Sequence, residues 1–473
     1  MDINKKKKIF ITVLACFLVV FLAFKLRLKN YDKIPFFGDS MDEYSYSWVG
    51  LSLIELGFPV GNSGMAGGYP FNDSRYINLD RVFQGPSNGI PFKINYPWFD
   101  HPPGTGLITG GFAYFKGARV FEDVGIFLIR KPMVYIGTLT TFLLFVFAFQ
   151  VFGLPTAIIS SLIYATAPIF VVSSRMIQAE NMLVPCFLLS LIFLFQYFKK
   201  NREIFLWLSA LAAGSSLLFK VSGISIILTN ILLLLSLNKG KTKKTIKDLI
   251  VFIPVSCSFI LFFITFGLVY DAQIFWNVLI SNTDRVYGIG AQAIYQLINS
   301  SPVTEGKFLT DGWIISGWIS FIALSFNKNK AKISWIFIPL LTYLLTYLFF
   351  GSFAFGWYRI PLYPFLSISL GYLIYSNLKK MTNFITSFIL IMLPTGFLVN
   401  EIYAQFIQTN SSVWRLLNLI LIILFIFLDT NLKIPKQFKK IANLLIIGLF
   451  IFALYLNLQF NQIIDVDYWY HIH

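Results

Sequence analysis

The sequence predicts an all-α polytopic membrane protein, a bundle of about 13 transmembrane helices joined by polar loops. Of the 473 residues, 56% are apolar and only 13% are charged, and the mean hydropathy is +0.70. Apolar runs of roughly twenty residues recur along the chain, which is the length that crosses a bilayer with every backbone hydrogen bond satisfied inside the helix. These observations exclude a soluble globular protein.

Two apolar stretches differ from a single span of ordinary length. The apolar stretch from Ile204 to Leu237 is predicted to form two short spans, because a lysine and a glycine interrupt it between Phe219 and Gly223. Thr105 to Phe115 is too short to span and is expected to lie at the membrane interface. The predicted spans are 9–25, 129–152, 155–173, 181–198, 204–219, 222–238, 249–270, 312–326, 333–351, 361–377, 382–400, 414–428 and 441–459.

The first apolar run and the tail are the two ends of the predicted bundle. Lys5 to Lys8 precede the first apolar run, and no small-residue cleavage pattern follows it, so this run is expected to be a retained signal anchor. After the last predicted span only 461–473 remain. We therefore expect one transmembrane domain over 1–460, with a short outer tail and no separate soluble domain.

The distribution of charge orients the bundle. With the amino terminus inside, inner segments carry 21 of the 38 Lys and Arg residues and four acids, which gives +17 inside and −1 outside. An excess of basic residues marks cytoplasmic loops. The overall charge of +16 is thus a property of the inner face, where it favours anionic lipids and gives no support to nucleic-acid binding. The long polar loops 26–128 and 271–311 then lie on the extracytoplasmic side.

The inner loops are short and contain no glycine loop of the kind that cradles phosphate, so a nucleotide-driven pump is not expected. The polar and charged residues of interest fall instead on the outer side. In the first outer loop, Ser40 to Gly57 is predicted to be a helix with Asp42 and Glu43 in its first turn. Acids also complement the helix dipole there, which is the plain structural alternative. The stretch between Pro59 and Asp100 has no clear period and is predicted to be a loop.

Several short motifs carry a resemblance to a known group. Asp42-Glu43-Tyr44 followed by Asp100-His101-Pro102-Pro103-Gly104 resembles the first-loop signature of GT-C membrane glycosyltransferases, especially protein O-mannosyltransferases and lipid A aminoarabinose transferases. The turn around Lys220-Val221-Ser222-Gly223 and the stretch Trp357-Tyr358-Arg359-Ile360-Pro361 are similar to later motifs of that group. The resemblance implies a GT-C fold and a sugar donor carried on polyprenyl phosphate.

Such a reaction needs a base for the acceptor and cations for the departing phosphate. Asp42 is predicted to be the base, with its neighbour Glu43 as the other catalytic candidate, because the sequence does not say which of them faces the donor. Positive charge for the phosphate can come from lysine and arginine at the ends of spans. The residues predicted to bind the donor phosphate or sugar are Asp100, His101, Arg175, Glu180, Lys220, Tyr358 and Arg359.

Each candidate also has a structural interpretation. Lys220 and Arg359 at span ends can reach the interface without any catalytic role. Arg175 and Glu180, five residues apart, are predicted to form a plain ion pair if they have no catalytic role. Asp284 and Arg285 in the second loop are expected to be a solvated pair, and His471 and His473 have no spacing typical of a metal site.

We therefore expect a glycosyltransferase of a bacterial inner membrane that moves a sugar from a polyprenyl-phosphate donor to a lipid, glycan or protein acceptor. No cofactor is required by the sequence; a divalent metal is left open, with Asp100 and His101 as its candidates. One alternative is a lipid or sugar transporter or flippase, but such proteins tend to carry charged residues within several spans, and the predicted spans here are nearly free of charge. The other is an outer-face polysaccharide polymerase or ligase, in which a large basic outer loop late in the chain is expected.

Overall fold

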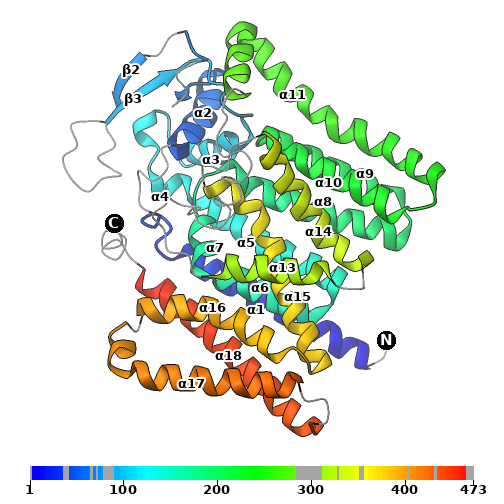
Figure 1. Ribbon diagram of the computed structural model, residues 1–473. Coiled ribbons are helices and arrows are strands. Elements are labelled where there is room, and N and C mark those ends of the chain that lie inside the picture. The colour runs from blue at the N-terminus through cyan, green and yellow to red at the C-terminus, as the bar shows by residue number, and fades with distance from the viewer. Residues whose placement is uncertain are drawn as a thin grey trace.

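A computed structural model describes residues 3–35, 42–63, 68–70, 73–77, 90–283, 312–326, 330–350, 356–402, 404–430 and 434–464. The described chain is almost entirely helical, as predicted, and its long helices pack into one bundle. The elements of the first loop gather at one end of this bundle (Figure 1). The predicted all-α membrane fold is confirmed.

Each of the thirteen predicted spans falls on a helical segment. By length and composition, seven helices in the described chain can cross a membrane, and five shorter apolar helices lie among them, so the exact number of spans stays a prediction. The helices of the bundle are α1 (Ile3–Leu28), α5 (Lys131–Phe152), α6 (Leu154–Thr166), α7 (Pro168–Ser173), α8 (Ala179–Lys200), α9 (Glu203–Ser215), α10 (Ile224–Leu237), α11 (Thr242–Thr283), α13 (Trp313–Ser325), α14 (Lys330–Phe350), α15 (Tyr363–Lys380), α16 (Phe384–Ile402), α17 (Ala404–Thr430) and α18 (Lys436–Ile463).

The predicted division of the apolar stretch 204–237 is confirmed. Two short 3₁₀ turns, η2 (Ser216–Leu218) and η3 (Val221–Gly223), separate α9 from α10. Lys220 lies between these turns in an extended conformation, where no helix could continue. The charge is therefore placed in the break itself and not within a span.

The predicted span 249–270 ends where the long helix α11 breaks. The backbone of Asp271 is non-helical, and a second helical part follows it and ends at Thr283. The carboxylate of Asp271 accepts a hydrogen bond from the backbone N–H of Ile274, 2.9 Å away, and so caps the second part of the helix. The sequence analysis did not predict this second helical part. Asp284 and Arg285 lie outside the described residues, as do Ser40, His471 and His473.

The first loop contains both helices and a small sheet. Its helices are α2 (Asp42–Leu56), α3 (Gly104–Phe115) and α4 (Ile126–Ile129), with the 3₁₀ turn η1 (Phe121–Asp123) before α4. Between α2 and α3, the strands β1 (Gly61–Asn62), β2 (Asp73–Ile77) and β3 (Ile90–Asn95) form an antiparallel sheet in the order β1-β3-β2. The prediction of an irregular loop over 59–100 was wrong. In β3, Phe92 and Ile94 are buried on either side of the exposed Lys93, and this alternation is too short to identify a strand from the sequence.

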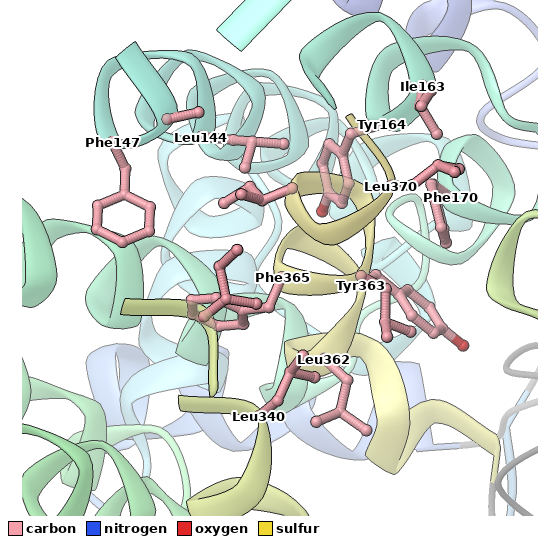
Figure 2. Packing of buried hydrophobic residues seen from close by; sticks show 14 of the residues in the cluster. Leu144, Phe147, Ile163, Tyr164, Phe170, Leu340, Leu362, Tyr363, Phe365 and Leu370 are labelled. Atoms are coloured by element: carbon pink, nitrogen blue, oxygen red, sulfur yellow. The ribbon is translucent and has the colours of Figure 1, made fainter. Parts of the chain in front are cut away.

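The core of the bundle lies between α5, α6, α8, α14 and α15. Figure 2 shows aromatic side chains of α5, α6, α7 and α15 in this core, with Phe147 of α5 near Phe365 of α15. Tyr363, at the start of α15, packs against Phe170 of α7 with ring centres 4.9 Å apart. Because α15 follows directly on the 3₁₀ helix η4 (Gly356–Leu362), this packing fixes the stretch that carries Tyr358 and Arg359.

Helices α2 and α3 lie side by side with their backbones in close contact (Figure 1). Gly106 and Gly110 of α3 face the backbone of α2, and Gly50 of α2 faces α3. The hydroxyl groups of Ser47 and Thr109 add a 3.0 Å hydrogen bond across the contact. Small residues spaced in this way let two helices approach closely, so α3 supports the position of α2 and of the acids at its start.

We expect Gly106→Ala to move α2 and destabilise the first loop. A Cβ atom at residue 106 would overlap the backbone carbonyl oxygen of Tyr46, and backbone atoms can yield only if the whole helix shifts. The cost is expected to be of the order of 1–3 kcal/mol, as for overpacking elsewhere. Protease accessibility of the first loop measures the effect, and Gly111→Ala, whose Cβ would meet only the tip of Ile54, is the matched control.

Candidate active site

The two acids at the start of α2 have different surroundings. Glu43 is fully buried, and both of its carboxylate oxygens accept hydrogen bonds from Arg130, at 2.9 Å from Nε and 2.6 Å from Nη2. The backbone N–H of Ile177 donates a further hydrogen bond to Glu43, at 2.9 Å. Asp42, by contrast, is exposed at the first turn of the helix. The neighbours that the sequence left equivalent are thus distinct: Glu43 is fixed between three donors, and Asp42 faces outward.

Arg130 was not among the residues predicted from the sequence. Its guanidinium also donates hydrogen bonds to the backbone carbonyls of Tyr31, at 3.3 Å, and Pro35, at 2.7 Å. One buried arginine therefore connects the end of α1, the start of α2 and the start of α5. The only signal in the sequence was an arginine at the edge of an apolar run, which is also typical of an ordinary membrane boundary.

Asp100 and His101 are held against the same end of α2. The Asp100 carboxylate accepts hydrogen bonds of 2.6 Å from both the Ser63 hydroxyl and the Tyr69 hydroxyl. Burial and the charge of Asp100 raise the pKa of Tyr69 well above its usual range, so this phenol stays a donor. The ring of His101 stacks on Tyr46 of α2, with ring centres 5.5 Å apart.

A second group comes from the bundle. Lys220 forms a buried ion pair with Glu180 at the start of α8, and its ammonium lies 4.1 Å from the centre of the Tyr358 ring. Burial by itself would lower the pKa of Lys220, but the charge of Glu180 outweighs this effect and raises the pKa above its ordinary value. The ammonium therefore stays charged. Tyr347 of α14 stacks on Tyr358, with ring centres 5.4 Å apart, and extends this group into the bundle.

The predicted ion pair between Arg175 and Glu180 was wrong. Arg175 instead donates hydrogen bonds to the backbone carbonyls of Ile34, at 3.2 Å, and Leu26, at 2.7 Å, while Glu180 pairs with Lys220. The two residues lie on either side of an extended Gln178, so they do not share a helix face. Burial, together with the positive charges of Arg27 and Arg130, lowers the pKa of Arg175 to about 9. Arg175 holds the end of α1.

Arg359 lies within η4, where it is 1% exposed and its Nε donates a 3.2 Å hydrogen bond to the Gly356 carbonyl. The interpretation that Lys220 and Arg359 merely reach from span ends to the interface does not fit their burial. Lys220 is 8% exposed and paired with an acid. These contacts thus join Lys220 to Glu180 and Tyr358. Arg359 follows Tyr358 in the chain, and the hydrogen bond from its Nε is to the Gly356 carbonyl within η4.

Tyr46 connects the two groups. It is buried, and its pKa is raised well above the usual range by that burial and then by Asp42, Glu180, Tyr358 and Asp100. Electrostatic interactions of this kind weaken with distance, so the first-loop acids and the bundle residues all lie within range of one phenol. Tyr46 stands four residues after Asp42, on the same face of α2. From the sequence alone, Tyr46 was expected only to be one of the apolar residues of this helix.

Asp100 and His101 are the residues that the sequence offers for a divalent metal. In the described ranges, no group of three or more His, Cys, Asp and Glu side chains is arranged to hold a metal ion. Asp100 already accepts hydrogen bonds on both carboxylate oxygens. The donor set that is described does not complete a metal site, and metal dependence stays a prediction for an assay with and without chelator.

The all-helical membrane bundle is similar in fold to the GT-C glycosyltransferases. Residues 100–268 match the sequence profile of the family described as dolichyl-phosphate-mannose-protein mannosyltransferase. No curated protein matches the chain in sequence. The predicted resemblance to GT-C enzymes is confirmed by this match together with the fold.

Solved structures with this fold include ArnT from Cupriavidus metallidurans. Its apo form is 14% identical over 97% of this chain and 78% of ArnT, with a TM-score of 0.51. The form bound to undecaprenyl phosphate is 13% identical over 96% of this chain and 78% of ArnT, with a TM-score of 0.52. The oligosaccharyltransferase AglB from Archaeoglobus fulgidus, in complex with an inhibitory peptide and a dolichol-phosphate, is 11% identical over 96% of this chain and 56% of AglB, with a TM-score of 0.54. At these identities the likeness establishes the fold.

Proposed function

We propose that the protein is a glycosyltransferase that moves a sugar from a polyprenyl-phosphate donor to an acceptor at the extracytoplasmic face of a bacterial inner membrane. The observation that carries this proposal is that the buried Tyr46 stacks on His101 and interacts electrostatically with Asp42, Asp100, Glu180 and Tyr358, in a fold similar to that of GT-C enzymes. Polyprenyl phosphates are present in the related structures of ArnT and AglB, which supports the donor class.

In the proposed reaction, a nucleophilic group of the acceptor attacks the anomeric carbon while the bond from that carbon to the phosphate oxygen breaks. The Asp42 carboxylate takes the proton from the nucleophile, and its exposed position at the start of α2 supports this role. The phosphate leaves with the bonding electrons and with the polyprenyl chain. Attack from the side opposite the phosphate inverts the anomeric carbon.

The remaining residues bind and orient the reacting groups. The Lys220 ammonium, charged and close to Tyr358, supplies positive charge for the leaving phosphate. The Tyr46 phenol, kept protonated by its raised pKa, is a hydrogen-bond donor for the sugar or the phosphate. Asp100 and His101 complete the first-loop side of the site. We assign Glu43 to positioning rather than to proton transfer, because Arg130 and Ile177 occupy its oxygens.

The test is transfer from a panel of radiolabelled polyprenyl-phosphate sugars by the purified protein in liposomes, with and without chelator. Transfer from one donor to an acceptor supports the proposal, and its loss with chelator identifies a metal requirement. If no donor turns over but labelled lipid crosses the bilayer, the protein is a flippase and the proposal fails.

Removing the charges of the Lys220–Glu180 pair is expected to weaken donor use. Because a lone partner would leave an uncompensated buried charge, the informative variant is the double change Glu180→Gln/Lys220→Gln. We expect its KM for the donor to rise by about tenfold or more, in line with the loss of a charged hydrogen bond to phosphate.

The control for this variant is Lys220→Arg, which keeps the charge and is expected to retain most of the donor affinity. If the double variant folds and keeps the wild-type KM, Lys220 has only a structural role, and the positive charge for the phosphate must come from another residue.

A further inference from the structure

A cavity of about 410 Å³ lies on the outside of the first loop, away from the candidate active site. It is formed where α3 ends, where η1 and α4 follow, and where α5 begins. Two lysines, Lys116 and Lys131, line it together with Tyr31 of the α1 end. The face of α3 that carries Gly106 and Gly110 packs on α2, and Phe112, which lines the cavity, stands on another face of α3. None of the residues that line the cavity is a predicted site residue.

The lining of this cavity is positively charged. Lys116 is exposed and Lys131 is half-buried, and among the cavity-lining residues the one acid is Asp123. The Asp123 carboxylate accepts hydrogen bonds from the backbone N–H groups of Arg119 and Val120, at 3.0 Å and 3.3 Å, and so holds its own turn. Two lysines against one acid in the lining give the cavity an affinity for an anion.

Exposed apolar side chains lie on α3 and α4, the helices that help to form the cavity. Phe115 is 81% exposed at the end of α3, Phe127 on α4 is 52% exposed, and Leu107 and Ile108 lie exposed on α3. A surface of this kind, next to lysines, is typical of contact with a membrane interface. Lys131 is the first residue of α5, within an apolar segment that is long enough to cross the bilayer. The cavity therefore lies where a span meets the headgroup layer.

We propose that this cavity binds the headgroup of an anionic phospholipid, with the phosphodiester between Lys116 and Lys131 and the acyl chains along the exposed apolar side chains of α3 and α4. Charge complementarity selects an anion, and the apolar surroundings select a lipid over a soluble phosphate. The site is separate from sugar transfer, and the proposal does not depend on that activity.

The experiment is native mass spectrometry of the full chain released from nanodiscs that contain equal amounts of phosphatidylglycerol and phosphatidylcholine. We expect the wild type to retain phosphatidylglycerol selectively. Each of Lys116→Gln and Lys131→Gln should lower the retained fraction about fivefold, and the double variant about thirtyfold, as follows from the usual contribution of a lysine near an anionic headgroup.

The matched control is Lys93→Gln/Lys241→Gln, which removes the same charge from exposed positions outside the cavity and should leave retention unchanged. Lys116→Arg/Lys131→Arg should restore it, and equal thermal midpoints exclude misfolding. Equal retention of both lipids, or unchanged retention in the double Gln variant, would overturn the proposal. Displacement of phosphatidylglycerol by glycerol phosphate would overturn it in favour of a free-phosphate site, and displacement by trace undecaprenyl phosphate in favour of a donor site.

Discussion

Asp42→Asn is expected to slow sugar transfer by about 10²–10⁴-fold, the usual contribution of a positioned general base. Asparagine keeps the shape of the side chain and can still cap the first turn of α2, but it cannot take a proton. Asp42 is exposed, so the change from Asp to Asn is made at the surface of the helix, and the variant is expected to fold. The measurement is kcat under saturating donor, with donor KM recorded in parallel.

The control for this variant is Glu55→Gln at the other end of the same helix. Glu55 is partly exposed and lies 3.7 Å from Arg119, where an ion pair contributes little. It should transfer sugar at the wild-type rate. A folded Asp42→Asn protein with wild-type kcat would show that another group is the base, and Asp100 would then be the next residue to test.

Glu43→Gln is expected to destabilise the protein by about 3–5 kcal/mol, because it leaves the buried Arg130 charge without its partner. Both side chains of this pair are 1% exposed, so water cannot replace the lost interaction. The loss should appear as a lower thermal midpoint in detergent and as faster proteolysis of the first loop. Activity should fall together with the folded fraction.

The double change Glu43→Gln/Arg130→Gln separates charge from shape in this contact. With no unpaired charge left, it should recover a substantial part of the stability lost by Glu43→Gln alone. If Glu43→Gln were as stable as the wild type but inactive, the carboxylate of Glu43 would be acting in the chemistry, and its assignment to positioning would be wrong.

The positions of the helices could be predicted because each depends on local composition. A run of about twenty apolar residues can satisfy its backbone in lipid only as a helix, and Lys220 with Gly223 marked the break between α9 and α10 correctly. The sheet of the first loop could not be predicted in this way. Its strands are short, and they are specified by pairing between segments such as 73–77 and 90–95 that no local period reveals.

The candidate site was predicted as a list of residues but not as an arrangement. Asp42, Asp100 and Tyr358 were identified by motif, and Glu180 by its place at the entrance of a span. All four interact electrostatically with Tyr46. The pairing of Glu43 with Arg130 joins residues 87 positions apart in the chain, and that of Glu180 with Lys220 joins residues 40 apart. Proximity in sequence suggested Arg175 for Glu180 instead. Partners of buried charges are decided by the packing of helices, which a single sequence does not record.

The hydrogen bond from the Ile177 backbone to Glu43 explains why the longer of the two acids stands at position 43. A glutamate at position 43 is long enough to meet Arg130 and the Ile177 N–H at once, and an aspartate there would fall one methylene short. The shorter acid stands at position 42, where the length of the side chain would set the distance from the proposed base to the substrate. The two acids thus place their carboxylates at different distances from the helix backbone. Exchanging them would change the distance from residue 43 to Arg130 and Ile177 and the reach of residue 42, while the composition and the charge of the chain stay the same.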